Sequence, residues 1–345
     1  MKFIVLFLVL AVGQTGIATV AEGQVTAAVG QTGTTGTVEE EAAKEKSSLV
    51  VRTFHIGNSL TDTVNGWLAP VAESAGKKLD FHRFTIPGAP TDWLWNHPGS
   101  GFGDSKYKEA FAKLAPIDHL FVQPFAGHAR SIENEAEHIQ KFFWLCRSKS
   151  MNVRLWLYQQ WPSKKYDENW SKGIYSLGSN IVYWRHKLTL SAGESLVDGD
   201  WAGWQLKKSG APKSWQEAAA NHTRYFEILR NDMQRRFPGR LVLIVPGGQA
   251  LIALKGRIEA GKVAGMTDFF GEIFADDVHL TAKGRYLISL VHYACIYRES
   301  PEGKVSLPET GLSGEQAGIF QKIAWQTAHD YKWSGITKSE SEDRR

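Results

Sequence analysis

Cysteine is scarce in this sequence of 345 residues, which contains only Cys146 and Cys295. Two cysteines can build neither a disulfide framework nor a four-cysteine zinc site. They can form one disulfide in an oxidising compartment, although the composition favours two buried free thiols. The sequence therefore excludes a small disulfide-rich scaffold and leaves the pairing of these two thiols open.

An excess of charge of one sign is also missing. The 40 Lys and Arg residues against 36 Asp and Glu residues leave a formal net charge of +4. No block rich in basic residues stands out beyond Lys207-Lys208 and Arg235-Arg236. Because nucleic-acid binding uses clustered basic residues to neutralise phosphates, we predict no nucleic-acid partner.

A long apolar run is missing as well. The run at residues 3–12 follows Met1-Lys2 and is shorter than the roughly 20 residues of a membrane span. An early positive charge, a short apolar run and small residues at 18–21 are typical of a secretory signal. We expect residues 1–21 to be a cleaved signal peptide, with an uncleaved anchor as the alternative. The protein is then secreted or periplasmic and keeps no stable membrane span.

Several common site motifs do not occur. The 11 His residues form no H-E-x-x-H sequence and no close His/Cys pair, so we predict no metal. The run at residues 99–103 is rich in Gly but has neither the G-x-G-x-x-G spacing nor the lysine of a phosphate loop. We interpret it as a flexible loop and predict no cofactor. No G-x-S-x-G elbow surrounds Ser59, which argues against the α/β-hydrolase class.

Composition divides the rest of the chain into segments. Residues 22–48 are mostly Gly, Thr, Val, Ala and Glu and cannot supply a core, so we predict a disordered spacer. Residues 49–332 form the predicted folded unit, and residues 333–345 a flexible polar tail. Within the folded unit, residues 163–214 show no regular hydrophobic periodicity of a helix or a strand. We predict that they are an insertion that borders the site.

Short β-rich runs alternate with helical patterns along the folded unit. This alternation is typical of a parallel sheet covered by helices on both faces, so we predict an α/β fold. Ligands in such folds bind beyond the carboxyl ends of the strands. The predicted strands are residues 49–56, 79–86, 119–124, 153–158 and 241–245, and the predicted helices are residues 66–75, 132–149, 215–236 and 281–297.

The sharpest local motif is Gly57-Asn58-Ser59-Leu60-Thr61, directly after the first predicted strand. A serine on a tight turn at a strand's carboxyl end can present its hydroxyl to a crevice, and nearby amides can stabilise an anion. The alternative is that Ser59 merely caps the following helix. Asn58 tolerates the backbone angles of a turn, and we expect it to be structural.

The second motif is Asp276-Asp277-Val278-His279, just before the last predicted helix. Residues three apart on a helical turn lie on one side, so Asp276 and His279 can meet. A carboxylate on one imidazole nitrogen leaves the other nitrogen free to act as a base. The alternative is that Asp276 or Asp277 caps the helix and His279 is a solvated turn residue.

Together the two motifs resemble the first and last signature blocks of the SGNH (GDSL-like) hydrolase superfamily. The resemblance implies a flavodoxin-like, three-layer α/β/α sandwich with a central parallel sheet of about five strands. It also implies metal-free hydrolysis of an ester. In this resemblance Ser59 is the nucleophile, His279 the general base and Asp276 the residue that orients it.

The resemblance extends to an oxyanion hole, with two departures. Gly88 lies where the family's second block has a glycine whose amide joins the hole. The third block normally holds an asparagine, whereas here Gln123 is the nearest amide-bearing substitute. The implied oxyanion hole is therefore Ser59, Gly88 and Gln123. The first block has Asn58 where aspartate is usual.

Tryptophan is over-represented, with 13 residues. Six of them lie in or beside the predicted insertion: Trp161, Trp170, Trp184, Trp201, Trp204 and Trp215. Exposed aromatic faces near a polar site suit sugar rings, and the alternative is that these indoles fill the core. We take Trp93, Trp95 and Trp161 as candidate substrate-binding residues, because the first two lie just after Gly88.

These observations predict an exported serine ester hydrolase that removes acyl groups, such as acetyl, from a carbohydrate through an acyl-enzyme. The expected partner is a small-molecule or polysaccharide ester. Two alternatives remain open. One is transfer of the acyl group to a sugar hydroxyl at the same site, and the other is a catalytically silent carbohydrate-binding protein that kept the fold.

Overall fold

The computed structural model describes residues 50–125, 132–164 and 214–336. The predicted signal peptide, the predicted spacer and nearly all of the predicted insertion lie outside these residues. The same holds for Trp170, Trp184, Trp201 and Trp204.

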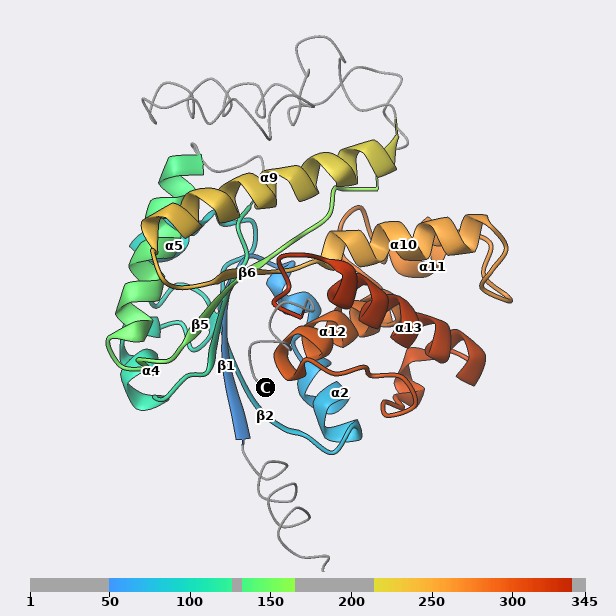
Figure 1. The fold of residues 1–345 in the computed structure, drawn as a ribbon, viewed down its shortest axis with the longest axis horizontal. Helices are drawn as coiled ribbons and strands as arrows, with labels where there is room; N and C mark the ends of the chain where they lie inside the picture. Colours follow the sequence, from blue (N-terminus) through green and yellow to red (C-terminus); the bar gives the residue numbers. More distant parts are fainter. Residues whose placement is uncertain (1–49, 126–131, 165–213, 337–345) are drawn as a thin grey trace, which may run out of the picture. The chain divides into compact units, whose positions relative to one another are not determined.

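A six-stranded sheet in the order β3-β2-β1-β4-β5-β6 forms the centre of the fold (Figure 1). Five of its strands are parallel and match the predicted ones, which confirms the α/β fold with a parallel sheet. Their bounds are β1 (Val50–Gly57), β2 (Lys78–Thr85), β4 (His119–Val122), β5 (Arg154–Tyr158) and β6 (Val242–Val245).

The sixth strand, β3 (Phe102–Gly103), was predicted to be part of a flexible loop. It pairs antiparallel with the end of β2. Gly103 has a φ of 74°, and a Cβ there would collide with the backbone oxygen of Arg83. Glycine therefore lets the chain approach the sheet edge. The prediction missed this strand because two residues are too short to show an alternating pattern.

Helices cover both faces of the sheet (Figure 1). One face carries α2 (Leu68–Ser74), α10 (Gly247–Glu259), α11 (Phe269–Ile273), α12 (Ala282–Tyr297) and α13 (Gly314–Asp330). The opposite face carries α3 (Thr91–Asn96), α4 (Tyr107–Lys113) and α5 (Ile132–Arg147). The long helix α9 (Trp215–Arg236) contributes to both cores. Two short 3-10 helices are η1 (Thr61–Thr63) and η3 (Pro308–Thr310).

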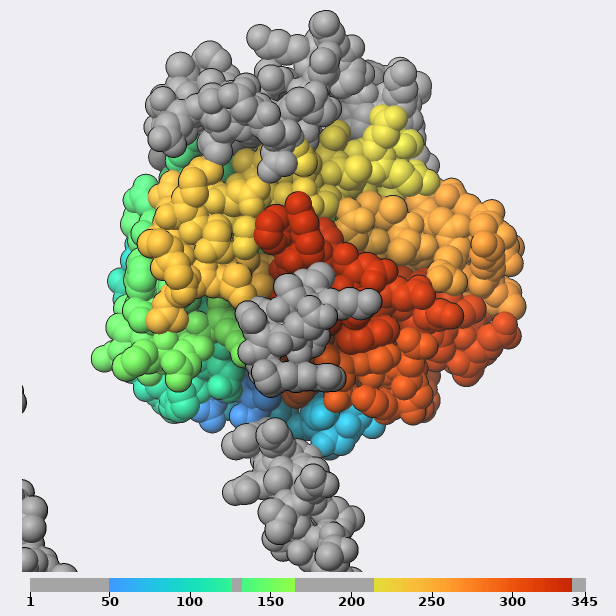
Figure 2. Space-filling model, in the orientation of Figure 1, coloured from blue at the N-terminus to red at the C-terminus, as the bar shows by residue number. Residues whose placement is uncertain are grey.

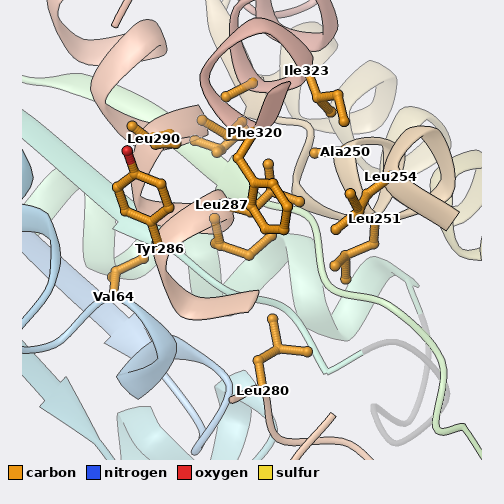
Figure 3. Packing of buried hydrophobic residues seen from close by; sticks show 14 of the residues in the cluster. Val64, Ala250, Leu251, Leu254, Leu280, Tyr286, Leu287, Leu290, Phe320 and Ile323 are labelled. Atoms are coloured by element: carbon orange, nitrogen blue, oxygen red, sulfur yellow. The ribbon is translucent and has the colours of Figure 1, made fainter. Parts of the chain in front are cut away.

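Alternation along the strands divides the core into two layers. In β4, Phe121 packs on the side of α12, whereas Leu120 and Val122 pack on the side of α5. On the α12 side, Leu287 of α12 lies close to Phe320 of α13 and to the leucines of α10 (Figure 3). Figure 2 shows α9 in yellow beside α10 in orange, with α13 in red next to them.

Helices α10 and α13 were not predicted. Helix α10 begins at Gly247-Gly248, which a sequence pattern treats as a stop. A Cβ at Gly247 would lie 2.8 Å from the backbone oxygen of Gln159, and one at Gly248 would lie 2.8 Å from that of Gln160. The two glycines therefore allow this helix to start directly against the end of β5.

The folded unit extends four residues beyond its predicted end at residue 332. Ile244 in β6 donates a backbone hydrogen bond to Trp333 at 2.8 Å. Ser334 is fully buried, and the Arg230 guanidinium lies 3.8 Å from the centre of the Trp333 ring. The segment up to Ile336 thus covers part of the exposed edge of β6.

The two cysteines do not pair. Cys146 lies in the core on the α5 side and Cys295 in the core on the α12 side. Both are buried free thiols, as the composition favoured.

Three buried histidines lie on the α12 side of the sheet. The His55 ring stacks on Phe121 at a centroid distance of 4.4 Å, and His292 of α12 lies 5.8 Å from His55. Trp156 donates its indole hydrogen to Nδ1 of His119 at 2.9 Å. Burial lowers the pKa of His292 to about 4 and that of His119 to about 3, and it lowers the pKa of His55 well below its ordinary value. All three are therefore neutral at pH 7.

We predict that His292 makes the fold sensitive to acid. An unfolded histidine binds a proton below about pH 6.5, whereas folded His292 does so only at a pKa of about 4. As the pH falls through this window, the unfolded state gains the proton first, so the free energy of unfolding decreases by about 1.4 kcal/mol per pH unit. His292→Leu should flatten the pH dependence by that amount between about pH 6 and pH 4.5, measured by urea unfolding.

Ser289→Ala is the matched control, because Ser289 is buried on the same helix and does not titrate. It should keep the wild-type slope of stability against pH. A slope in His292→Leu equal to that of the wild type would contradict the prediction.

Candidate active site

Ser59 lies on a tight turn where β1 leaves the sheet. The Leu60 N–H donates to Asn58 Oδ1 at 3.0 Å, and the Thr61 N–H donates to the Asn58 backbone oxygen at 3.0 Å. The chain then enters η1. The N-cap of η1 is Leu60 and that of α2 is Trp67, so Ser59 caps neither helix.

Gly57 and Gln123 hold this turn in place. A Cβ on Gly57 would lie 2.8 Å from the Gln123 side chain and would also collide with Thr61, so glycine is required there. Gln123 Oε1 accepts the Asn58 N–H at 3.1 Å and the Thr61 hydroxyl at 3.1 Å. The end of β4 thereby holds the turn that follows β1.

The loop before α12 is shaped by Asp276. Its Oδ1 accepts the N–H groups of Val278 at 2.9 Å and His279 at 2.8 Å. The Ala275 N–H donates to the His279 backbone oxygen at 2.8 Å and closes the loop. The N-cap of α12 is Thr281, so Asp276 and Asp277 do not cap that helix.

The structure brings the two motifs together. His279 Nδ1 lies 2.7 Å from Asp276 Oδ2, and His279 Nε2 lies 2.9 Å from Ser59 Oγ, across 220 residues of sequence. The Asp276 side chain is 57% exposed and that of His279 is 44% exposed, so a ligand can reach them. A carboxylate, an imidazole and a hydroxyl in this order can activate the hydroxyl as a nucleophile.

Asp276 is held as a carboxylate. Burial alone would raise its pKa, but the hydrogen bonds from Val278 N–H, His279 N–H and the imidazole lower the pKa to about 2. The carboxylate therefore accepts the Nδ1 hydrogen of His279 and leaves Nε2 facing Ser59.

Arg285 of α12 connects the two segments of the site. Its guanidinium donates to the backbone oxygens of Thr63 at 3.0 Å, Asp62 at 2.9 Å and Asn65 at 2.8 Å. These carbonyls belong to the segment just after Ser59. The helix that follows His279 is thus bonded directly to the turn that carries the serine.

Asp62 fastens η1 to the end of β2. Its carboxylate lies 2.8 Å from the Arg83 guanidinium and accepts the Thr85 hydroxyl at 3.1 Å. Burial raises the pKa of Asp62, and the nearby Arg83 only partly offsets that effect. The segment after Ser59 is therefore attached to both β2 and α12.

Two backbone amides are available as oxyanion donors. Within the described residues, the N–H groups of Ser59 and Gly88 donate to no other group. Gly88, with φ of 68°, lies in a turn closed by Ala89 N–H to Ile86 O at 3.1 Å. The Ile86 N–H in turn donates to Gly57 O at 3.1 Å, which places this turn beside the end of β1.

Gln123 does not fit its predicted role as an oxyanion donor. Its side chain is 1% exposed, and its Nε2 donates to Pro124 O at 2.8 Å and to Gln160 Oε1. Both amide hydrogens are therefore used inside the protein. Gln123 instead positions the Ser59 turn through its oxygen.

The candidate tryptophans differ in position. Trp93 on α3 is 52% exposed, and one face of its indole stacks on the His97 ring, with 3.7 Å between the ring centroids. Trp95 is half-buried, and its ring centroid lies 5.1 Å from that of Phe142. Its ring therefore packs against the hydrophobic core on the α5 side. Trp161 is 1% exposed, which contradicts its predicted contact with substrate.

Trp161 and Trp215 instead anchor the chain on either side of residues 165–213. The Trp161 indole donates to Val278 O at 2.9 Å, within the loop that carries Asp276 and His279. The Trp215 indole donates to Pro162 O at 3.2 Å. Of these two rings only Trp161 was predicted to contact substrate, from a composition that does not distinguish a buried indole from an exposed one.

Arg285, Asp62 and the anchoring role of Trp161 were missed by sequence reasoning. Arg285 did leave a signal, because Arg285 and Lys283 place two cations in the first turn of a largely apolar helix. The positive end of the helix dipole disfavours a cation there, so such a residue needs a partner elsewhere. Asp62 and Trp161 left no comparable signal.

The described ranges hold no group of three or more His, Cys, Asp or Glu side chains suited to a metal ion. Among these same residues, no helix has both the length and the apolar character needed to cross a membrane.

No family model matches the chain, and no curated protein matches it. Solved structures do. A DUF4886 family protein from Bacteroides uniformis is similar with a TM-score of 0.55 and 13% identity, over 85% of this chain and 99% of that chain. At this identity the likeness shows the fold alone.

Names from the predicted superfamily occur among the similar structures. A protein from Slackia heliotrinireducens, named as a candidate SGNH hydrolase, has a TM-score of 0.40 and 15% identity over 70% of this chain and 96% of its own. A member of the lipolytic G-D-S-L family from Veillonella parvula has a TM-score of 0.37 and 10% identity over 72% and 97%. The chain has an α/β fold with a central, mostly parallel sheet that helices cover on both faces, as its sequence predicted.

Proposed function

We propose that this protein is an exported serine hydrolase of carboxylic esters, with an acylated carbohydrate as its substrate. The observation that carries the proposal is the hydrogen-bonded series from Asp276 through His279 to Ser59. The first residues of the sequence, with their signal-like pattern, support export.

The first half of the reaction forms an acyl-enzyme. Ser59 Oγ attacks the ester carbonyl carbon while His279 Nε2 takes the hydroxyl proton. The carbonyl oxygen becomes an oxyanion and accepts hydrogen bonds from the Ser59 and Gly88 amides. His279 then gives its proton to the alcohol oxygen as the bond between that oxygen and the carbonyl carbon breaks.

The second half of the reaction hydrolyses the acyl-enzyme and regenerates the free enzyme. A water molecule replaces the alcohol, His279 takes its proton, and the resulting hydroxide attacks the acyl carbon. The bond to Ser59 Oγ breaks, and Ser59 recovers its proton from His279. Throughout, the Asp276 carboxylate accepts the Nδ1 hydrogen and stabilises the imidazolium that forms twice in each cycle.

Trp93 supports a carbohydrate substrate. Helix α3 begins three residues after Gly88, so the exposed Trp93 indole and the Gly88 amide belong to one short stretch of chain. His97 covers one face of the ring and holds it in place. The exposed part can stack on the C–H face of a sugar whose hydroxyls stay hydrated.

Ser59→Ala should lower kcat/KM for an aryl acetate by at least about 10³-fold, because no other hydroxyl replaces the nucleophile. Hydrolysis is followed by release of the aryl alcohol, and folding by circular dichroism. Ser74→Ala is the control, since that exposed serine lies at the end of α2 and bonds to Ser306, and neither residue belongs to the hydrogen-bonded series of the site. Undiminished turnover by Ser59→Ala would rule out the acyl-enzyme.

Asp276→Asn should lower kcat by about 10²- to 10⁴-fold, because a neutral amide no longer fixes the imidazole tautomer or stabilises the imidazolium. Asp277→Asn is the matched control one residue away. Asp277 accepts the Lys164 N–H through its backbone oxygen, which the substitution keeps. Equal losses in the two variants would show that Asp276 has no special part in the reaction.

Trp93→Ala should raise KM for an acetylated oligosaccharide about tenfold and leave KM for a small aryl acetate unchanged, because only the sugar stacks on the indole. The comparison uses initial rates with both substrates. Trp144→Ala is the control: Trp144 is 42% exposed near the end of α5, which runs back toward the amino ends of the strands. The same KM change in both variants would exclude a sugar contact at Trp93.

A further inference from the structure

Hydrogen bonds fix the backbone on both sides of His279. The peptide that joins Val278 to His279 donates its N–H to Asp276 Oδ1 at 2.8 Å. The oxygen of the same peptide accepts the indole hydrogen of Trp161 at 2.9 Å. On the other side, the His279 oxygen accepts the Ala275 N–H at 2.8 Å. Because each peptide is planar, two fixed peptides set the direction in which the His279 side chain leaves the backbone.

The bond from Trp161 differs from the other two because it comes from outside the loop. Asp276 and Ala275 are neighbours of His279 in sequence, so their bonds shape the loop without placing it on the sheet. Trp161 follows β5 and lies 117 residues before Val278. The indole bond therefore ties the histidine loop to the end of a central strand.

The same stretch of chain reaches the turn that carries Ser59. Gln160 directly precedes Trp161 and accepts a hydrogen from Gln123 Nε2. Gln123 Oε1 in turn accepts the Asn58 N–H at 3.1 Å. Two adjacent buried residues thus connect with the two halves of the site, Gln160 with the serine turn and Trp161 with the histidine loop.

The reaction depends on how these halves are placed. His279 Nε2 lies 2.9 Å from Ser59 Oγ, whose proton it takes. A displacement of about 1 Å at the reacting groups can lower a rate about 10²-fold. Arg285 acts from α12, beyond the histidine, on the segment after Ser59. Trp161 acts on the peptide that ends at His279 itself.

We propose that Trp161 is a positioning residue of the reaction, whose indole N–H holds the Val278–His279 peptide so that His279 Nε2 faces Ser59 Oγ. The inference rests on the proposed serine hydrolase function. The Trp161 ring is buried, so it acts through the backbone of His279 and not through the substrate.

Trp161→Phe keeps an aromatic ring in the core and removes the hydrogen that Val278 O accepts. Trp156→Phe is the matched control. Trp156 lies on β5, is fully buried in the same core, and donates its indole hydrogen to His119 Nδ1, also at 2.9 Å. Both variants lose one buried bond of the same length, and only the first loses a bond to the histidine loop.

The readouts are kcat and KM for an aryl acetate, the rate of Ser59 labelling by a fluorophosphonate, and the melting temperature. Trp161→Phe should lower kcat about 10- to 10²-fold at an unchanged KM, because the lost bond affects the transition states and not substrate binding. Labelling should slow as well, since Ser59 needs the same base. Trp156→Phe should lower the melting temperature to a similar extent and keep the wild-type kcat, KM and labelling rate.

A lower kcat at wild-type KM in folded Trp161→Phe, with wild-type kcat in Trp156→Phe, supports the proposal, and every other pattern overturns it. Wild-type kcat in Trp161→Phe would make the indole bond irrelevant to the reaction. Equal losses of kcat in the two variants would be a general effect of a weakened core. A loss of kcat accompanied by a higher KM would be a change in substrate binding.

A second substitution serves if Trp161→Phe does not fold, as judged by circular dichroism. Benzothienylalanine in place of Trp161 keeps the size of the indole and has sulfur where the N–H was. The same replacement of Trp156 is then the control, and the same pattern of kcat and KM decides.

The wild-type protein distinguishes the two levels of inference. If it neither hydrolyses the ester nor reacts with the fluorophosphonate, the serine hydrolase function fails and the positioning role of Trp161 fails with it. If the wild type is active and labelled while Trp161→Phe equals it, only the role of Trp161 is wrong.

Discussion

The geometry of the site depends on the hydrogen bonds that the Arg285 guanidinium donates to the segment after Ser59. Ser59 and His279 are 220 residues apart, and each lies in a short irregular segment outside the helices and strands. Arg285 bonds the helix after the histidine to three carbonyls after the serine. Because hydrogen bonds from a charged donor contribute about 1.5–3 kcal/mol each, this one side chain can hold the two segments in register. The rest of α12 is fixed by its packing against α13.

The fold was largely predictable because its central strands are buried. Strand β6 is apolar throughout and β4 is buried along its whole length, which is the pattern of a covered parallel strand. Helix α10 escaped prediction because its first two residues are glycines, whose purpose is a close approach to another part of the chain. A local pattern cannot show such an approach. The edge strand β3 was taken for a loop because its two residues are too short to show an alternating pattern.

The sequence predicted which residues form the candidate site better than it predicted where their side chains point. The motifs indicated Ser59, Asp276 and His279, and the structure places these three side chains in one hydrogen-bonded series. Gln123 was expected to donate toward the substrate, but its oxygen faces the turn and its nitrogen faces the interior. Residue type and position do not tell which end of an amide points where. Trp161 shows the same limit, since composition cannot reveal that an indole is buried.

The bond between the Trp215 indole and the Pro162 carbonyl joins two points that are 53 residues apart in sequence. Pro162 and Trp215 therefore lie side by side in the fold. A loop with closed ends can gain or lose residues at a small entropic cost, because the cost of closure grows only with the logarithm of loop length. Relatives of this chain could thus carry segments of very different size at this position and exchange them over evolutionary time, without moving the frame that holds the reacting groups.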